Sequence, residues 1–140
     1  MRVSEAEIAG AAARIPAEAR IAIELAATRI TAFHERQRPH DIAYTDETGT
    51  KLGMCWRALN SVGIYVPGGT AAYPSSVLMN AVPARVAGVG RIAMTVPCAS
   101  GNPNPLVLEA ARLCGITEIY KIGGAQAIAA LAFGTATIDS

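Results

Sequence analysis

Two loops carry the residues best suited to holding a ligand. The first, 67–74, follows an apolar stretch that contains Tyr65, and it begins with Pro67, Gly68 and Gly69. Adjacent glycines let the backbone turn sharply and approach a bound molecule closely, while Tyr65 offers a ring face and a hydroxyl. Two interpretations fit this loop: a cofactor contact, or a tight strand-to-helix connection with a tyrosine packed at the strand end.

The second loop, 123–126, begins with Gly123 and Gly124, ends at Gln126 and leads into an apolar stretch. If a helix begins there, its free N–H groups and positive dipole end can receive a pyrophosphate. Gln126 is then a long amide placed to contact the ligand. Alternatively, the glycines only make the turn and Gln126 bonds to nearby backbone.

Other residues with reactive side chains are weaker candidates. Cys98 follows an apolar stretch, but no histidine lies near it in sequence to activate it, so we expect an idle thiol. His34 and His40 flank the end of a helical segment, and a metal site needs three or four converging ligands. The motif G-x-G-x-x-A over 88–93 leads into a predicted strand instead of following one, and is therefore no dinucleotide fingerprint.

The elements that must position the two loops form three successive strand–helix units. Strands are predicted at 62–66, 92–96 and 118–122. The helices are predicted to begin at Ser75 or Ser76, at Pro105 after the N-cap Asn104, and at Ala125. Pro83 should kink or split the first of them. Such units predict an α/β fold, an incomplete Rossmann-like parallel sheet whose ligands bind at the carboxyl ends of its strands.

The first sixty residues have a different pattern. Ser4 and Glu7 form a capping box for a helix that we expect to bury positions through Ile15. A second amphipathic helix is predicted from Pro16 to near Arg38, followed by a turn at 46–49 and a weak strand within 52–59. The chain is therefore divided into an N-terminal helical segment with connecting strands, 1–60, and a partial Rossmann-like domain, 61–140.

Composition narrows the functional class. The 140 residues carry a net charge of +1, which does not favour nucleic-acid binding, and no apolar run is long enough to span a membrane. Three cysteines without a C-x-x-C pair suggest reduced thiols in the cytoplasm. A hydrophobic content of 51% is high for so small a domain, so we expect both oligomerisation and a place within a larger protein.

Three blocks, 63–89, 104–108 and 118–134, together with the helical segment ending at 33–37, resemble the histidinol dehydrogenase family. The resemblance implies a homodimeric, zinc-dependent enzyme that oxidises L-histidinol to L-histidine through the bound aldehyde, using two NAD⁺. It places NAD contacts at Tyr65 and Gln126. It also implies that the zinc ligands and catalytic residues lie outside this span, so that the chain alone binds NAD weakly at best and catalyses nothing.

Two other hypotheses remain open. Related NAD-dependent dehydrogenases oxidise other small alcohols, and the residues that select the substrate are not expected in this span. The apolar surplus and the narrow sheet also fit a non-catalytic nucleotide-binding or assembly fragment.

Overall fold

A parallel sheet forms the centre of the molecule. The computed structural model describes residues 2–68, 71–98 and 101–139. Strands β3 (Ser61–Tyr65), β4 (Arg91–Thr95) and β5 (Glu118–Tyr120) pair in the order β3-β4-β5, all parallel. The predicted three-stranded α/β sheet is confirmed, and the carboxyl ends of its strands share one edge.

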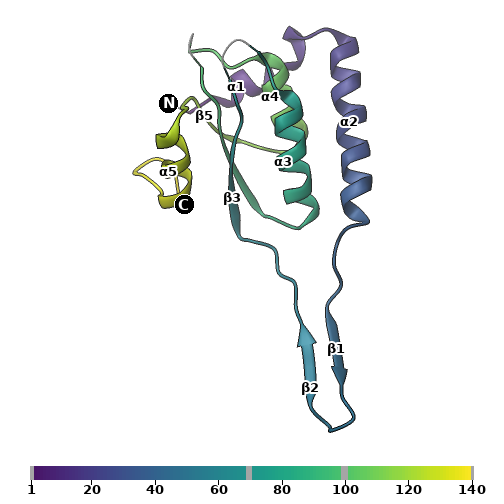
Figure 1. Ribbon diagram of the computed structural model, residues 1–140. Helices are drawn as coiled ribbons and strands as arrows, with labels where there is room; N and C mark the ends of the chain where they lie inside the picture. Colours follow the sequence, from purple (N-terminus) through teal and green to yellow (C-terminus); the bar gives the residue numbers. More distant parts are fainter. Residues whose placement is uncertain (1, 69–70, 99–100, 140) are drawn as a thin grey trace.

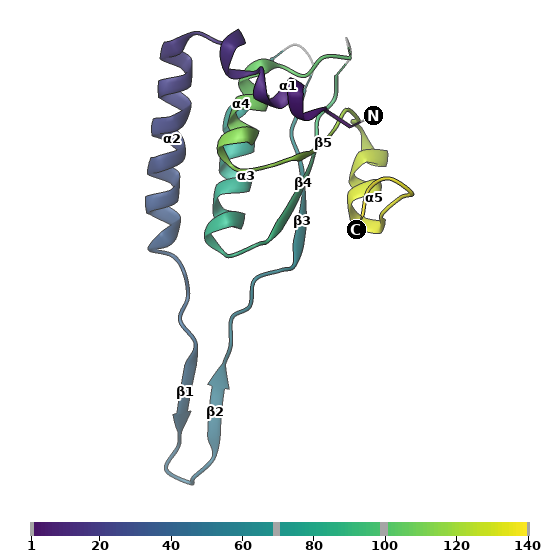
Figure 2. The same cartoon turned by 180° about the vertical axis from the view of Figure 1, so that it is seen from behind.

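Helices lie on both faces of this sheet. On one face are α3 (Pro74–Val86) and α4 (Pro105–Leu113), and on the other is α5 (Ala125–Phe133) (Figures 1 and 2). Strand residues alternate between the faces: Ile64 and Met94 enter the main core, whereas Ala93 packs in a smaller cluster with Ala130 of α5. The predicted helix over 125–133 is confirmed, and Gly134 ends it with a φ of 75°.

Helix α3 corrects two predictions. It begins at Pro74, with Tyr73 as an N-cap that makes no side-chain bond, so neither Ser75 nor Ser76 caps it. A proline at the first helical position loses no bond and already has a helical φ. Of the kink or split predicted at Pro83, the split does not occur: the helix continues through Pro83, whose carbonyl still accepts the Ala87 N–H at 2.9 Å.

The N-terminal segment forms a further layer. After α1 (Glu5–Ala9) and the 3₁₀ turn η1 (Ala12–Arg14), α2 (Ala17–Glu35) lies beside α3 and α4 (Figure 2). The predicted capping box is present, but α1 is shorter than expected since Gly10 ends it. Helix α2 ends at Glu35, before the predicted Arg38, as the chain turns toward the hairpin.

A two-stranded antiparallel hairpin extends away from the body (Figures 1 and 2). It consists of β1 (Ile42–Thr45) and β2 (Lys51–Met54), and all their residues are exposed. The predicted turn is confirmed: Asp46 Oδ1 accepts the N–H groups of Thr48 and Thr50, both at 2.9 Å. The strand predicted within 52–59 is only partly right, because β2 ends at Met54.

The main core joins both halves of the chain. Val3, Ile8 and Ile23 belong to the same buried cluster as the sheet residues Ile64 and Met94. The proposed division into 1–60 and 61–140 stays a prediction. None of the described helices is both long and apolar enough to cross a bilayer.

Candidate functional site

The carboxyl edge of the sheet brings Tyr65 next to the start of α5. The Gly124 N–H donates a hydrogen bond to the Tyr65 hydroxyl oxygen, with an N–O distance of 3.3 Å. Tyr65 is the last residue of β3 and Gly124 is the N-cap of α5. The two loops that the sequence singled out therefore meet, although Tyr65 and Gly124 lie 59 positions apart.

Both loops also pack against Pro97, which follows β4. A Cβ atom at Gly68 would lie 2.4 Å from the Pro97 carbonyl oxygen, and one at Gly123 would lie 2.5 Å from Pro97 Cγ. At distances this short, a side chain at either position would force the loop or Pro97 to move. Gly68 and Gly123 are thus glycines because three segments converge here, and Pro67 lies in the same cluster. Gly69 and Thr70, also part of the first loop, lie outside the described residues.

Gln126 folds back over the start of its own helix. A Cβ atom at Gly124, whose φ is 77°, would lie 2.7 Å from Gln126 Oε1 and 3.0 Å from Nε2. Only glycine adopts this φ readily and also leaves room for the amide. The side chain is exposed, and within the described part of the chain it makes no hydrogen bond. Among the described residues, the Gln126 amide is exposed and lies against Gly124.

The cysteine at this edge is poorly suited to act as a nucleophile. Cys98 is half-buried and its thiol donates to the Val96 carbonyl oxygen at 3.4 Å. Burial raises the pKa of the Cys98 thiol. Because the thiolate is the reactive form, the prediction of an idle thiol agrees with this environment.

A cavity of about 560 Å³ opens at the same edge. It lies between the ends of β3 and β4 and the start of α4, and its lining includes Pro67, Gly68, Pro97, Cys98 and Asn104. Its size is in the range of small-molecule sites. Arg14, from the N-terminal segment, also lines it.

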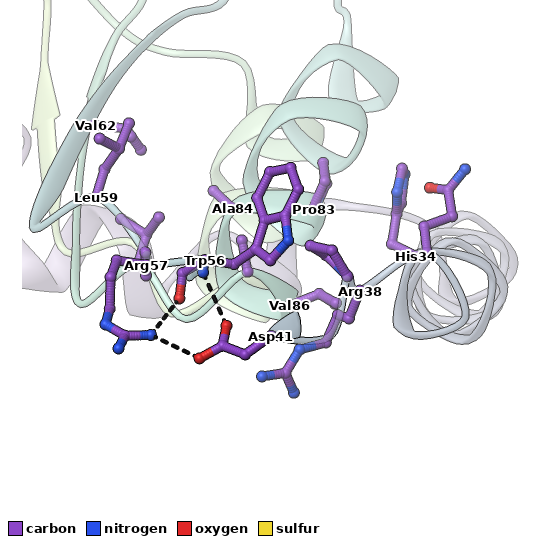
Figure 3. A pocket seen from close by; sticks show the side chains of 15 residues that line it. His34, Arg38, Asp41, Trp56, Arg57, Leu59, Val62, Pro83, Ala84 and Val86 are labelled. Atoms are coloured by element: carbon purple, nitrogen blue, oxygen red, sulfur yellow. Dashed lines mark hydrogen bonds and ion pairs between the residues drawn. The ribbon is translucent and has the colours of Figure 1, made fainter. Parts of the chain in front are cut away.

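A second cavity, of about 670 Å³, lies elsewhere (Figure 3). Its walls come from the end of α2, the segments flanking the hairpin and the end of α3, and they include His34, Trp56 and Pro83. The Asp41 carboxylate in this wall accepts the Trp56 N–H at 2.8 Å and an Arg57 N–H at 3.2 Å, and these bonds, the first above all, lower its pKa. No predicted site residue lies here.

A metal centre is not formed by the described residues. Among them, no three His, Cys, Asp or Glu side chains come close enough together to hold an ion. His34 and His40, the two histidines considered as weak candidates, fall within this statement. The residues present therefore do not fit a zinc ion.

The sequence pattern of the histidinol dehydrogenase family matches residues 1–140. The chain belongs to the histidinol dehydrogenase family. It is 61% identical to the histidinol dehydrogenase of Ruegeria pomeroyi over 138 residues, which is 99% of this chain and 32% of that protein. It is 63% identical to histidinol dehydrogenase 1 of Trichormus variabilis over 136 residues, 97% of this chain and 32% of the relative.

The fold comparison agrees. The crystal structure of histidinol dehydrogenase from Elizabethkingia anophelis superposes with a TM-score of 0.93 at 42% sequence identity, covering 99% of this chain and 32% of that one. The chain thus spans about a third of the histidinol dehydrogenases it matches.

Sequence reasoning missed one residue at the carboxyl edge of the sheet, Arg14. Arg14 was assigned no role, because it lies in a helical segment far along the chain from every loop of the sheet. No local spacing connects it to Pro97 or Asn104, and only the packing of η1 against α4 places it at the cavity.

Proposed function

We propose that this chain forms part of the NAD-binding region of a histidinol dehydrogenase. The protein at its natural length oxidises L-histidinol to L-histidine in two NAD-dependent steps through the aldehyde, in histidine biosynthesis. Membership of the family supports the substrate, and the meeting of the Tyr65 and Gly124 loops supports the location of the cofactor.

The observation that carries the proposal is the pair of glycines packed on Pro97. A Cβ at Gly68 or Gly123 would occupy space now filled by Pro97, so the two glycines allow both loops to pack together at the carboxyl edge. Glycine-containing loops gathered at the carboxyl edge of a parallel sheet are where such folds bind dinucleotides. NAD, when bound, accepts the hydride; the protein residues hold and orient it.

Each predicted residue has a specific role in this proposal. The Tyr65 hydroxyl and ring contact the cofactor, and the exposed Gln126 amide donates to it or accepts from it. Gly123 and Gly124 supply the start of α5, whose dipole favours a phosphate. Pro67 and Gly68 contact the cofactor from the first loop.

Three further properties belong to the protein at its natural length. We infer a zinc ion bound by residues outside this span, since the described side chains do not assemble a site. We also infer a homodimer located in the cytoplasm. The exposed apolar side chains of the hairpin and of α2, among them Tyr44, Trp56 and Phe33, support burial against further protein.

Calorimetric titration of NAD⁺ into the protein at its natural length tests the cofactor site. We expect Tyr65→Ala to weaken binding about tenfold or more, because both ring contact and hydroxyl are lost, and Tyr65→Phe to have a smaller effect. Tyr44→Phe, on the distant hairpin, is the matched control. Unchanged affinity in Tyr65→Ala would contradict the assignment of this edge.

Activity provides the second test. Adding L-histidinol and NAD⁺ to the protein at its natural length should produce NADH at 340 nm, whereas residues 1–140 alone should produce none. NADH formation by residues 1–140 alone would show that the catalytic groups are within this span, against the proposal.

A further inference from the structure

Arg14 presents a positive charge to the cavity at the carboxyl edge of the sheet. Its Nε donates to the Gly10 carbonyl at 3.2 Å and its Nη2 donates to the Glu7 carbonyl at 3.1 Å. Both carbonyls belong to the end of α1, so the side chain is anchored at a defined place in the cavity wall. A guanidinium has five N–H bonds, and these two contacts use two of them.

The charge of Arg14 is not neutralised within the described part of the chain. The salt bridges there do not include Arg14. The carboxylate of Glu7, the acid nearest in sequence to its anchor, already accepts from Lys121 Nζ at 2.7 Å and from the Ser4 N–H at 2.9 Å. Cys98, in the same wall, adds no negative charge because burial raises its pKa. The cavity therefore has an anchored cation with spare donors and no described counter-ion.

Asn104, which lines the same cavity, complements this cation. Asn104 caps α4 by accepting the Leu106 N–H on its Oδ1 at 2.9 Å, which leaves its amide N–H groups for another partner. The positive end of the α4 dipole is also directed to this region. A guanidinium and amide donors that line one cavity suit an anion with several acceptor oxygens.

We propose that Arg14 binds one phosphate group of a nucleotide in this cavity. The identity of that nucleotide rests on the proposed NAD function, whereas the anion site itself does not. Arg14 thus adds the N-terminal segment to a site that the sequence assigned only to residues 61–140. In this arrangement, η1 contributes to cofactor binding and is more than a structural connection.

The test compares ligands with and without phosphate, using calorimetry on the protein at its natural length. NAD⁺, ADP-ribose, AMP and inorganic phosphate are the probes, and adenosine is the phosphate-free control. We expect Arg14→Gln to weaken NAD⁺ and ADP-ribose about tenfold and adenosine not at all, with Arg14→Lys restoring part of the loss. The salt dependence of NAD⁺ binding should also decrease in Arg14→Gln.

Arg29→Gln, an exposed arginine on α2, is the matched control, and circular dichroism checks that each variant folds. Equal NAD⁺ affinity in wild type and Arg14→Gln would overturn the inference while leaving the cofactor proposal intact. If NAD⁺ does not bind but AMP or inorganic phosphate binds in an Arg14-dependent way, the anion site stands and the NAD assignment fails. Absence of binding by every phosphate probe would reject both.

Discussion

Arg91 and Glu118 join neighbouring strands through a bidentate ion pair. Arg91 Nε lies 2.9 Å from Glu118 Oε1, and Nη2 lies 2.8 Å from Oε2. Both side chains are about three-quarters buried, with 26% and 23% of their surface exposed. The pair therefore sits at the amino end of β4 and β5, where it holds the register of the sheet, and the bonds from Arg91 lower the pKa of Glu118.

Replacing Arg91 should destabilise the sheet. We expect Arg91→Met to reduce the free energy of unfolding by about 1–2 kcal/mol, because Glu118 loses two charge-assisted bonds while staying partly buried. Urea denaturation measures the change. Arg57→Met is the control, since its pair with Asp41 is 74% and 50% exposed and should contribute less than about 0.5 kcal/mol. Equal effects of the two variants would contradict this account.

Acid should weaken the contact between α1 and β5. The bond from Lys121 Nζ, followed by those from Ser4, lowers the pKa of Glu7 from 4.5 to about 2. A lowered folded-state pKa means that this stabilisation is complete above pH 4.5 and is lost as the pH falls toward about 2. Urea midpoints between pH 7 and pH 2 should therefore fall less steeply in Glu7→Gln than in wild type. Identical slopes would show that Glu7 does not contribute.

A methyl group at Gly123 should disturb the cofactor edge. Gly123→Ala places a Cβ 2.5 Å from Pro97 Cγ, so the loop or Pro97 must move. We expect stability to fall by about 1–3 kcal/mol and NAD⁺ affinity to fall about tenfold. Gly90→Ala is the matched control, because its Cβ would only make ordinary contact with the Asn60 carbonyl at 3.8 Å. A harmless Gly123→Ala would mean that the three segments are not tightly packed.

The three cysteines should differ widely in reactivity. Burial raises the pKa of Cys114 from 9.0 to about 11, so near pH 8 very little of it is thiolate, while Cys55 is exposed. Iodoacetamide labelling followed by mass spectrometry should modify Cys55 first, Cys98 more slowly, and Cys114 only after denaturation. Early labelling of Cys114 would place it nearer the surface than the structure does.

One buried hydroxyl should be replaceable. Thr95 is fully buried, and within the described residues its Oγ1 has no hydrogen-bond partner. Thr95→Val keeps the shape and removes the unpaired group, so unfolding should become harder by up to about 1 kcal/mol. In the control Thr31→Val, a bond to the Ala27 carbonyl at 2.8 Å is lost, and stability should fall. A large loss in Thr95→Val would reveal a partner for its hydroxyl.

Local signals in the sequence predicted much of this fold. The cap at Asn104, the helix ending at Gly134 and the turn at Asp46 each depend on neighbouring residues, and all three are confirmed. The errors arise where a local signal competes with another. Ser75 and Ser76 are good caps, but Pro74 precedes them and takes the first helical position.

In the candidate site, too, local sequence signals were informative and tertiary contacts could not be predicted. Tyr65 and Gln126 could be selected because each stands beside a glycine loop at a strand or helix end, and the sheet rule placed both loops at one edge. Contacts between segments that are far apart in the chain leave no pattern in the residue spacing. Neither the packing of Gly68 on Pro97 nor the position of Arg14 could be read from residue spacing, because both depend on tertiary packing.

The first residues of the chain have their partner at the far end of the sequence. The Val3 N–H donates to the Ile119 carbonyl at 2.8 Å, and Arg2 forms an antiparallel bridge with Tyr120, so this short segment covers the outer edge of β5. On the ribosome, which adds roughly 5–20 residues each second, that edge emerges on the order of ten seconds after Val3. Throughout that interval residues 2 and 3 have no strand to join.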